Sequence, residues 1–503
     1  MIGPVHSGKS TLTGRLIYEC NGIDKKSNEQ IKNKLVKDKK QKENITFPYS
    51  WVTDVSNRER DLGHTIDLAV KKIETPKSYI TIIDSPGYSS GKIKGGNRID
   101  HVQTMIVGLS QADFVVLVVS AEQVASTDIN EVQTRDHAKI AYKLGIKKII
   151  VAINKIDSAS SNFFSDRYPE ISNKISEWLT DIGYEQQNIT FVPLSGLNGY
   201  NLVKKSTDIP ILNESSYNEL LDATKSSKTL VEAIDMLTEP ERHKSASSFP
   251  LRFVVDVAMN SNRTYDKKKG TVVCGRIKTG FMQKGMKIKI TPLNCFEDYY
   301  IESIQIDKEE VMEASAGDNA GIRISNLTPK QIRPGNIISD PENEPAKKCL
   351  TFTAEIFIEN SPNEIFLSTS SRDDHQKTTK HTTFFIQCHA AYFNCTLIKV
   401  LKKKDAQSRE TIEPQSIRNG DTALVEMRPG KAISIETDET GRYSSLSRFV
   451  IRKKEQLIGF GVVKSIKYNR NTEDNRNVPE QNNGNVSHTN NNQSPNHDII
   501  VNA

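Results

Sequence analysis

Short apolar runs, each followed by a polar loop, recur through the first half of the chain. The runs at 114–120, 147–153 and 189–194 have the length and composition of buried strands. Amphipathic segments at 11–18 and 134–144 predict helices in the same region. Strands that alternate with helices in this way predict an α/β domain with a mostly parallel sheet.

The pattern changes after residue 250, where short β-rich runs are separated by Gly, Asn and Asp turns. This part of the chain predicts all-β structure. Residues 206–248 form a polar connector with a short predicted helix at 229–237. Residues 469–498 are rich in asparagine and poor in apolar side chains, a composition typical of disordered segments.

The first predicted helix follows a sequence typical of phosphate-binding loops. Residues 3–10 read Gly-Pro-Val-His-Ser-Gly-Lys-Ser and fit the pattern G-x-x-x-x-G-K-[ST]. The glycines let backbone N–H groups point at a phosphate, which the helix N-terminus also attracts. We expect Lys9 to reach the β- and γ-phosphates and the Ser10 hydroxyl to bind Mg²⁺. The predicted nucleotide-binding residues here are Gly3, His6, Ser7, Gly8, Lys9, Ser10 and Thr11.

A buried strand normally precedes such a loop, and here only Met1 and Ile2 do. Two explanations stay open: a reading frame that starts too late, or loss of the strand. Upstream codons for a strand of about six apolar residues would favour the first.

Two further loops carry candidate metal and phosphate ligands. Thr65 lies in the loop 58–67, where its hydroxyl would be a second Mg²⁺ ligand and its backbone N–H would meet the γ-phosphate. The run 79–84 predicts a buried strand that ends on Asp84 and is followed by Ser-Pro-Gly87. We expect Asp84 to hold Mg²⁺ through water and the Gly87 N–H to sense the γ-phosphate.

The sequence Asn-Lys-Ile-Asp at 154–157 selects the base in this interpretation. Asp157 can accept hydrogen bonds from guanine N1–H and N2–H₂, which adenine cannot donate. We expect Asn154 to brace the neighbouring loops, Lys155 to lie along base and ribose, and a backbone N–H at 195–196 to meet guanine O6. The predicted base-binding residues are Asn154, Lys155, Asp157, Ser195 and Gly196. Because ligands bind at strand ends in open α/β sheets, we predict a site for GTP or GDP with Mg²⁺.

Composition limits the number of domains, the kinds of partner and the compartment that we expect. The 503 residues are too many for one core, and the formal net charge of +6 permits an RNA partner without requiring one. The six cysteines are scattered, which favours reduced structural thiols in a cytoplasmic protein. Neither a membrane-spanning run nor a signal peptide is found, so we expect no membrane contact.

Stretches that connect these motifs resemble eukaryotic elongation factor 1-alpha, a family of translational GTPases. They read LIYECNGIDK at 16–25, YSWV at 49–52, RER at 58–60, SQAD at 110–113 and AYKLG at 141–145. The likeness runs to about residue 467 and continues in GTVVCGRIKTG at 270–280 and MRPGK at 427–431. It implies a GTPase domain at 1–240, β-barrel domains at 248–345 and 349–468, and a tail at 469–503.

The resemblance also implies a function. A member of this family binds aminoacyl-tRNA in the GTP form, delivers it to the ribosome with GTP hydrolysis and is recharged by a guanine nucleotide exchange factor. We expect a monomer. The implied catalytic positions are Lys9, Thr65 and Tyr88.

The chain departs from the family pattern in its hydrolytic machinery. Tyr88 stands where the family has a histidine that positions the attacking water, and a phenol is a poor substitute for imidazole at neutral pH. His6 replaces an aspartate, residues 89–98 add a basic stretch, and residues 61–62 and 368–380 read as insertions. We expect nucleotide binding to be retained and hydrolysis to be slow.

Two alternatives stay open. One is a release-factor or ribosome-rescue GTPase that carries a protein resembling tRNA in shape. The other is a non-catalytic paralogue whose barrels bind RNA, actin or another protein, with nucleotide as a structural ligand only.

Overall fold

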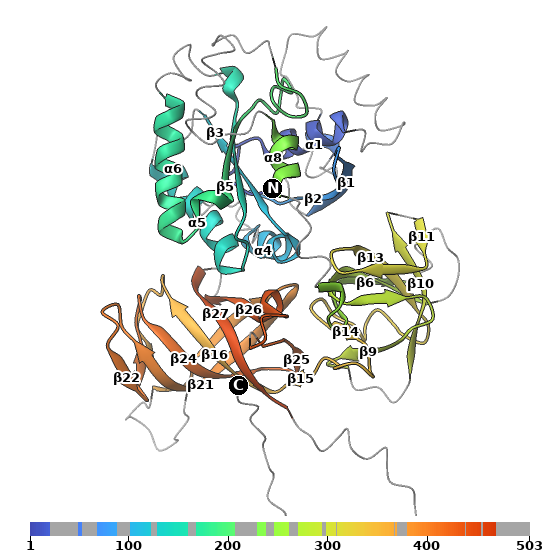
Figure 1. Cartoon of the computed structure of the whole chain (residues 1–503). Helices are drawn as coiled ribbons and strands as arrows, with labels where there is room; N and C mark the ends of the chain where they lie inside the picture. The colour runs from blue at the N-terminus through green and yellow to red at the C-terminus, as the bar shows by residue number, and fades with distance from the viewer. Residues whose placement is uncertain are drawn as a thin grey trace, which may run out of the picture. The chain divides into compact units, whose positions relative to one another are not determined.

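The computed structural model describes residues 1–20, 49–52, 68–87, 101–121, 128–158, 167–206, 229–237, 246–260, 270–293, 298–307, 309–366, 368–369, 380–437, 439–453 and 456–468. The chain divides into two compact units, Met1–Glu241 and Arg242–Ala503. Figure 1 shows helices around a sheet in the first unit and strands throughout the second. Thr65, Tyr88, the insertions at 61–62 and 89–98 and the tail at 469–503 lie outside the described residues.

The first unit alternates helices and strands along the chain. Its elements are α1 (Lys9–Glu19), η1 (Ser50–Val52), β1 (Ala69–Glu74), β2 (Tyr79–Asp84), α4 (His101–Gln111), β3 (Val115–Ser120), α5 (Asp128–Lys143), β4 (Ile149–Asn154), η2 (Ile156–Ser158), α6 (Tyr168–Ile182), η4 (Gln186–Asn188), β5 (Ile189–Pro193) and α8 (Leu230–Leu237).

Strands β3, β4 and β5 form a parallel sheet in that order. Every residue of β3 and β4 is buried, because helices cover both faces. On one face Val116, Ile150 and Val192 share a core with residues of α1 and α8, while α5 and α6 lie on the other side of the sheet in Figure 1. The loops that follow β4 and β5 therefore leave from the same edge.

Residues 1–2 join this sheet to a second pair of strands. Ile2 donates to Val116 O (2.9 Å) and accepts from the Val118 N–H (2.8 Å), and the Met1 amine donates to Ile83 O (2.8 Å). Strand β2 pairs antiparallel with β1. The prediction that 79–84 is buried throughout is wrong: only Ile82–Asp84 are buried, because β2 belongs to a hairpin whose far end is exposed.

The second unit begins with a closed barrel, which we call the first barrel. Strands β10, β13, β7, β6, β14 and β9 pair in that order, and β9 pairs with β10 to close the ring. Its strands are β6 (Arg252–Asn260), β7 (Thr271–Thr279), β8 (Phe281–Gln283), β9 (Lys287–Thr291), β10 (Tyr299–Ile306), β11 (Glu309–Val311), β12 (Glu313–Ser315), β13 (Asn319–Ile324) and β14 (Ile337–Ser339).

The second barrel closes in the same way. Strands β20, β26, β27, β16, β24 and β21 pair in that order, and β21 pairs with β20. The elements of this region are β15 (Lys348–Cys349), β16 (Thr351–Ile358), β17 (Ile365–Phe366), β18 (Ser368–Thr369), β19 (Lys380–His381), β20 (Thr383–Cys388), β21 (Ala391–Lys404), β22 (Glu410–Ile412), β23 (Ser416–Ile417), β24 (Thr422–Pro429), β25 (Ile433–Ser434), α10 (Ser444–Ser447), β26 (Arg448–Lys453) and β27 (Gln456–Lys467). The predicted fold class, an α/β domain followed by two β-barrels, is confirmed.

A buried ion pair joins the two barrels. Arg252 Nε of β6 lies 2.5 Å from Glu436 Oε1, which follows β25 in the second barrel, and the Arg252 side chain is only 2 % exposed. The Arg252 guanidinium also stacks on the Tyr443 ring, 4.5 Å from its centroid. Around the pair, apolar residues of both barrels form one small core: Val254, Ile337, Ala346, Tyr443 and Leu446.

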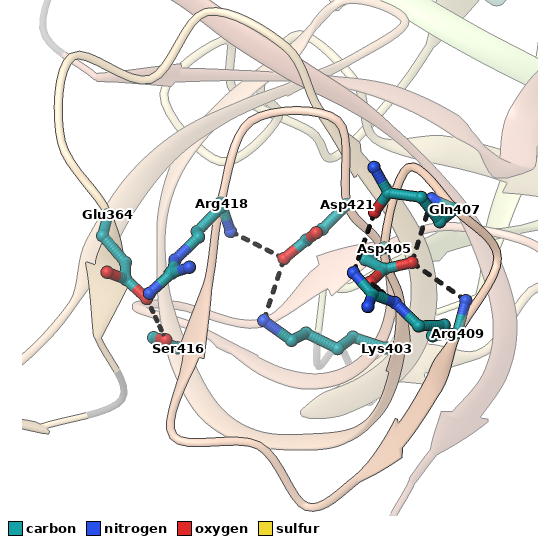
Figure 2. A network of polar contacts seen from close by, with 8 residues as sticks. All are labelled: Glu364, Lys403, Asp405, Gln407, Arg409, Ser416, Arg418 and Asp421. Carbon is teal, nitrogen blue, oxygen red and sulfur yellow. Dashed lines mark hydrogen bonds and ion pairs between the residues drawn. The ribbon is translucent and has the colours of Figure 1, made fainter.

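Alternating cations and carboxylates surround one end of the second barrel, where β21 and β22 form a hairpin (Figure 2). Asp421, 4 % exposed, accepts from Lys403 Nζ (3.0 Å) and from the Arg418 N–H (2.8 Å). Asp405 Oδ2 accepts from Arg409 Nε at 2.7 Å. The other ion pairs of this end are Arg418–Glu364, Lys399–Glu413, Lys402–Glu410 and Lys404–Glu410.

Candidate functional site

The loop between Ile2 and α1 has the strained backbone that its glycines allow. Gly3 has φ 142° and Gly8 has φ 90°, and a Cβ at these positions would lie 2.2 Å from Val118 O and 2.4 Å from Asn154 Nδ2. His6 takes φ 65°, a left-handed conformation that is uncommon outside glycine. The loop therefore lies directly against β3 and the last residue of β4.

Lys9, the first residue of α1, points back over this loop. Its side chain is 6 % exposed, and its Nζ donates to Pro4 O at 2.9 Å. Burial lowers the pKa of the Lys9 ammonium to about 8, although Asp84 opposes the shift. A buried cation whose main hydrogen-bond partner is a neutral carbonyl is well prepared to bind a more negative ligand.

Asp84 supplies an anion at the end of β2, where it is fully buried. Burial raises the pKa of its carboxyl, while the Met1 amine, Lys9 and hydrogen bonds from the Ser10 and Thr13 side chains lower it. Oδ1 accepts from Thr13 Oγ1 at 3.4 Å, and Oδ2 has no hydrogen-bond partner among the described residues.

A metal ion fits this chemistry. The Ser10 hydroxyl hydrogen-bonds the Asp84 carboxyl, whose Oδ2 has no partner among the described residues, and the charge of Lys9 acts on the same carboxyl. In the described part of the chain, no group of three or more His, Cys, Asp or Glu side chains could hold a metal alone. Oxygen ligands completed by phosphate and water are typical of Mg²⁺ rather than of zinc.

Gly87 lies against Lys9 and the loop before α1. A Cβ at this position would lie 2.9 Å from Lys9 Nζ and 3.0 Å from the Val5 Cα, so any larger residue would push into the loop. The three predicted phosphate-side elements, the loop 3–10, Asp84 and Gly87, are thus brought together by the structure.

Asn154, the last residue of β4, links the loop before α1 to the loop after β5. Its Nδ2 donates to Ser7 O and its Oδ1 accepts from the Gly196 N–H, both at 2.9 Å. Lys155 follows with φ 66°, and its Cε lies 3.9 Å from the Cβ position of Gly8. Asp157, on η2, is exposed and leaves its carboxylate available to a ligand.

The loop after β5, predicted to meet the base, has a fixed conformation. Ser195 Oγ accepts from the Asn198 N–H (3.0 Å) and Gly199 takes φ 81°. A Cβ at Gly196 would lie 3.0 Å from the Leu12 Cα, so this loop packs closely on α1. A residue larger than glycine at position 196 would therefore push this loop away from α1.

Sequence reasoning missed two residues that support these loops. Arg15 of α1 donates from Nη1 to the Tyr49 hydroxyl (2.7 Å) and to Leu197 O (3.2 Å). Its guanidinium also lies 4.7 Å from the Tyr49 ring centroid. No local pattern marks them, because the partners are far apart in sequence.

Thr65 and Tyr88 lie outside the described residues, so the predicted second metal ligand and the water-positioning residue have no geometry to report. The remaining predicted site residues lie at or just after the ends of β2, β4 and β5, in the loop before α1 and in the first turn of α1. This arrangement can hold a chain of phosphates at one end and a purine base at the other. In the described part of the chain, every helix is too short or too polar to span a membrane.

Three family models match the chain in order. The Elongation factor Tu GTP binding domain matches residues 1–240, Elongation factor Tu domain 2 matches 270–339, and the GTP-eEF1A C-terminal domain-like model matches 371–464. The first match covers the unit that holds the loops described above, and the other two fall on the two barrels.

Curated relatives match over nearly the whole chain. Elongation factor 1-alpha of Onchocerca volvulus is 36 % identical over 471 residues, which is 93 % of each chain. Elongation factor 1-alpha of Absidia glauca is 35 % identical over 472 residues, again 93 % of each.

Solved structures share the fold at lower identity. The Ski7 GTPase-like domain of S. cerevisiae bound to GTP is 17 % identical, with a TM-score of 0.64, and the match covers 92 % of this chain and 95 % of that one. Elongation factor SelB of Methanococcus maripaludis with the GTP analogue GPPNHP is 19 % identical, with a TM-score of 0.56, and covers 93 % and 79 %. These likenesses concern the fold, whereas the sequence identity to the curated relatives is high enough to show the family. The chain belongs to the elongation factor 1-alpha family of translational GTPases, as a divergent member.

Proposed function

We propose that this protein is a GTP- and Mg²⁺-dependent elongation factor that binds aminoacyl-tRNA and releases it on the ribosome. The observation that carries the proposal is the junction at Asn154, which joins the phosphate loop to the base loop through hydrogen bonds at 2.9 Å. The identity of 36 % to an elongation factor 1-alpha over 93 % of the chain supports the wider role. An exchange factor, a cytoplasmic location, a monomeric state and domain limits at 1–240, 248–345 and 349–468 belong to the same proposal.

Each site residue has a role in the proposed binding. Lys9 and the backbone of the phosphate loop hold the β- and γ-phosphates, with Gly87 beside them. Ser10 and Asp84, joined by Thr65, hold the Mg²⁺, which supplies charge neutralisation on the phosphate oxygens. Asp157 reads the base.

The experiment that tests the site is a titration with fluorescent GDP and GTP, competed with unlabelled ATP. Tight binding that ATP does not displace and that Lys9→Ala abolishes is the expected result. The absence of guanine-nucleotide binding in the unaltered protein would contradict the proposal and favour a non-catalytic role for the barrels.

A second experiment separates the elongation role from its alternatives. Aminoacylated tRNA is offered to the protein with a GTP analogue or with GDP. Binding in the GTP form alone supports delivery of aminoacyl-tRNA. Binding of a release-factor-like protein in place of tRNA would instead indicate a release or rescue GTPase, and binding that ignores the nucleotide would indicate a paralogue without a GTP cycle.

Nucleotide binding is expected to take up protons at alkaline pH. In the free protein the pKa of Lys9 is about 8, so part of these lysines is neutral at pH 8.5, whereas bound phosphate raises this pKa and favours the charged form. Binding at pH 8.5 should then take up a fraction of a proton, and affinity should fall as pH rises above 8. Calorimetry in buffers of different ionisation enthalpy measures the uptake.

At pH 8.5 Lys9 is expected to be the main group of the site that takes up a proton. The pKa of the nearby Met1 amine is about 6, so that group is already neutral there, and the phosphates are fully ionised. In the control Lys9→Arg the guanidinium stays charged, and the uptake should vanish. Uptake that is absent from the unaltered protein, or unchanged in this control, would show that Lys9 does not hold the phosphates.

Tyr88→His is expected to raise ribosome-stimulated GTP hydrolysis. Imidazole can orient or deprotonate water near neutral pH and a phenol cannot, so we expect a gain of about tenfold, a modest part of what such a group contributes. Single-turnover hydrolysis of GTP with ribosomes measures it, and Tyr88→Phe is the control that should show no gain. An unchanged rate for Tyr88→His would mean that Tyr88 is not the limiting defect.

A further inference from the structure

We propose that Arg15 is a positioning residue for guanine recognition, through which α1 holds the loop 195–199 that meets the base. The inference rests on the proposed function, because it concerns the affinity of the same nucleotide site. It adds a residue that contacts neither base nor phosphate.

The loop 195–199 has two lateral supports. On one side the Gly196 N–H donates to Asn154 Oδ1 at 2.9 Å. On the other side the Arg15 guanidinium donates to Leu197 O at 3.2 Å from Nη1, with Asn198 O at 3.4 Å from Nη2. Asn154 fixes the start of the loop, and Arg15 fixes its middle.

Arg15 is itself held in place from two directions. Its Nε donates to Glu19 Oε1 at 2.6 Å, one helical turn further along α1. Its Nη1 donates to the Tyr49 hydroxyl at 2.7 Å, and the guanidinium lies over the Tyr49 ring. A Cβ at Gly14 would lie 1.8 Å from Tyr49 O, so the backbone at Tyr49 lies directly against α1.

The arrangement differs from an ordinary surface ion pair. The Arg15 and Glu19 side chains are only 20 % and 23 % exposed, so solvent screens them less than a fully exposed pair. The acceptors at Leu197 and Asn198 are main-chain carbonyls, and main-chain atoms cannot leave by a change of rotamer. The planar fork of donors on arginine suits two adjacent carbonyls, which the single ammonium of lysine cannot span.

The geometry has a functional consequence. A base-binding loop that is held before the nucleotide arrives costs less ordering on binding, so the complex dissociates more slowly. Loss of Arg15 should therefore weaken the contact with the base and leave the phosphate contacts unchanged. Ligands with and without a base separate these two effects.

The test compares Arg15→Met with the unaltered full-length protein. Release of fluorescent GDP is expected to become about tenfold faster, the effect of losing charge-assisted hydrogen bonds. The affinity for inorganic tripolyphosphate, which has no base, should stay the same, and Arg15→Lys should recover part of the loss. Arg135→Met, which removes an exposed pair with Asp181 on other helices, is the matched control and should release GDP at the unaltered rate.

Several results would overturn the inference. Unaltered GDP release from Arg15→Met, or an equal loss of affinity for tripolyphosphate, would show that Arg15 has no specific role at the base. If Arg15→Met does not fold, Tyr49→Phe removes only the hydroxyl that holds the guanidinium, and an unchanged release rate in that variant would overturn the inference too. Failure of the unaltered protein to bind GDP would overturn the proposed function as well, so the two failures are distinct.

Discussion

Replacement of Asp157 by asparagine is expected to change the preferred base from guanine to xanthine. The Asp157 carboxylate offers two acceptors to the N1–H and N2–H₂ donors of guanine, whereas asparagine offers one acceptor and one donor. Xanthine carries a carbonyl in place of the 2-amino group and so matches the amide. The ratio of GDP affinity to xanthosine diphosphate affinity should change on the order of a thousandfold, since a buried mismatch of donors is costly.

The measurement is a competition between the two nucleotides for the site occupied by fluorescent GDP. Asp181→Asn, the same substitution at an exposed carboxylate near the end of α6, is the control and should keep the preference for guanine. A preference for guanine that survives in Asp157→Asn would show that another residue reads the base. An equal loss of affinity for both nucleotides would show that Asp157 supports the loop and does not contact the base.

Replacement of Glu436 by leucine is expected to destabilise the second unit by about 3–5 kcal/mol, because it leaves the Arg252 charge buried without its partner. Burial raises the pKa of the Glu436 carboxyl and the Arg252 charge lowers it, with burial the larger effect. The desolvation of Glu436 disappears with its side chain, whereas the Arg252 side chain stays only 2 % exposed and loses its carboxylate partner. Calorimetry should show Tm lower by about 10 °C.

The double variant Arg252→Met/Glu436→Leu separates charge from packing. Replacing both members of a buried pair by apolar residues is often close to neutral, so the double variant should regain most of the lost stability. Lys464→Ala breaks an exposed pair with Glu355 and should change the free energy of unfolding by no more than about 0.5 kcal/mol. A Glu436→Leu protein as stable as this control would show that the barrels do not depend on the pair.

Local sequence was sufficient for the strands that carry the site. All six residues of β4 are buried. Five of them are apolar, and the sixth is Asn154 at the end of the strand. The predicted strand differs from β4 by one or two residues at each end. Helix α5 begins at Asp128, earlier than predicted, because its first turns are polar and the amphipathic pattern starts only near 134. Strand β1 was missed, since two lysines interrupt its apolar alternation and its pairing with β2 decides its structure.

The pairing of strands that are far apart in the sequence could not be predicted from local sequence patterns. The β-rich composition after residue 250 predicted strands, but which strands meet to close each ring depends on partners far apart in sequence. The hydrogen bonds of Arg15 are a case of the same kind, because the acceptor at Leu197 is 182 residues away in the sequence. The nucleotide motifs were visible because each lies within a few consecutive residues at the end of one strand.

The lysines of β21 have a consequence for RNA. Three consecutive lysines would by themselves attract a phosphate backbone and release its counterions. Here Lys402 and Lys404 lie 3.5 and 3.9 Å from Glu410, and Lys403 lies 3.0 Å from Asp421. A polyanion at this end of the second barrel would have to displace carboxylates already in place, and its gain in affinity at low salt would be small. These carboxylates partly neutralise the three lysines, so this end should attract RNA less strongly than three unpaired lysines would.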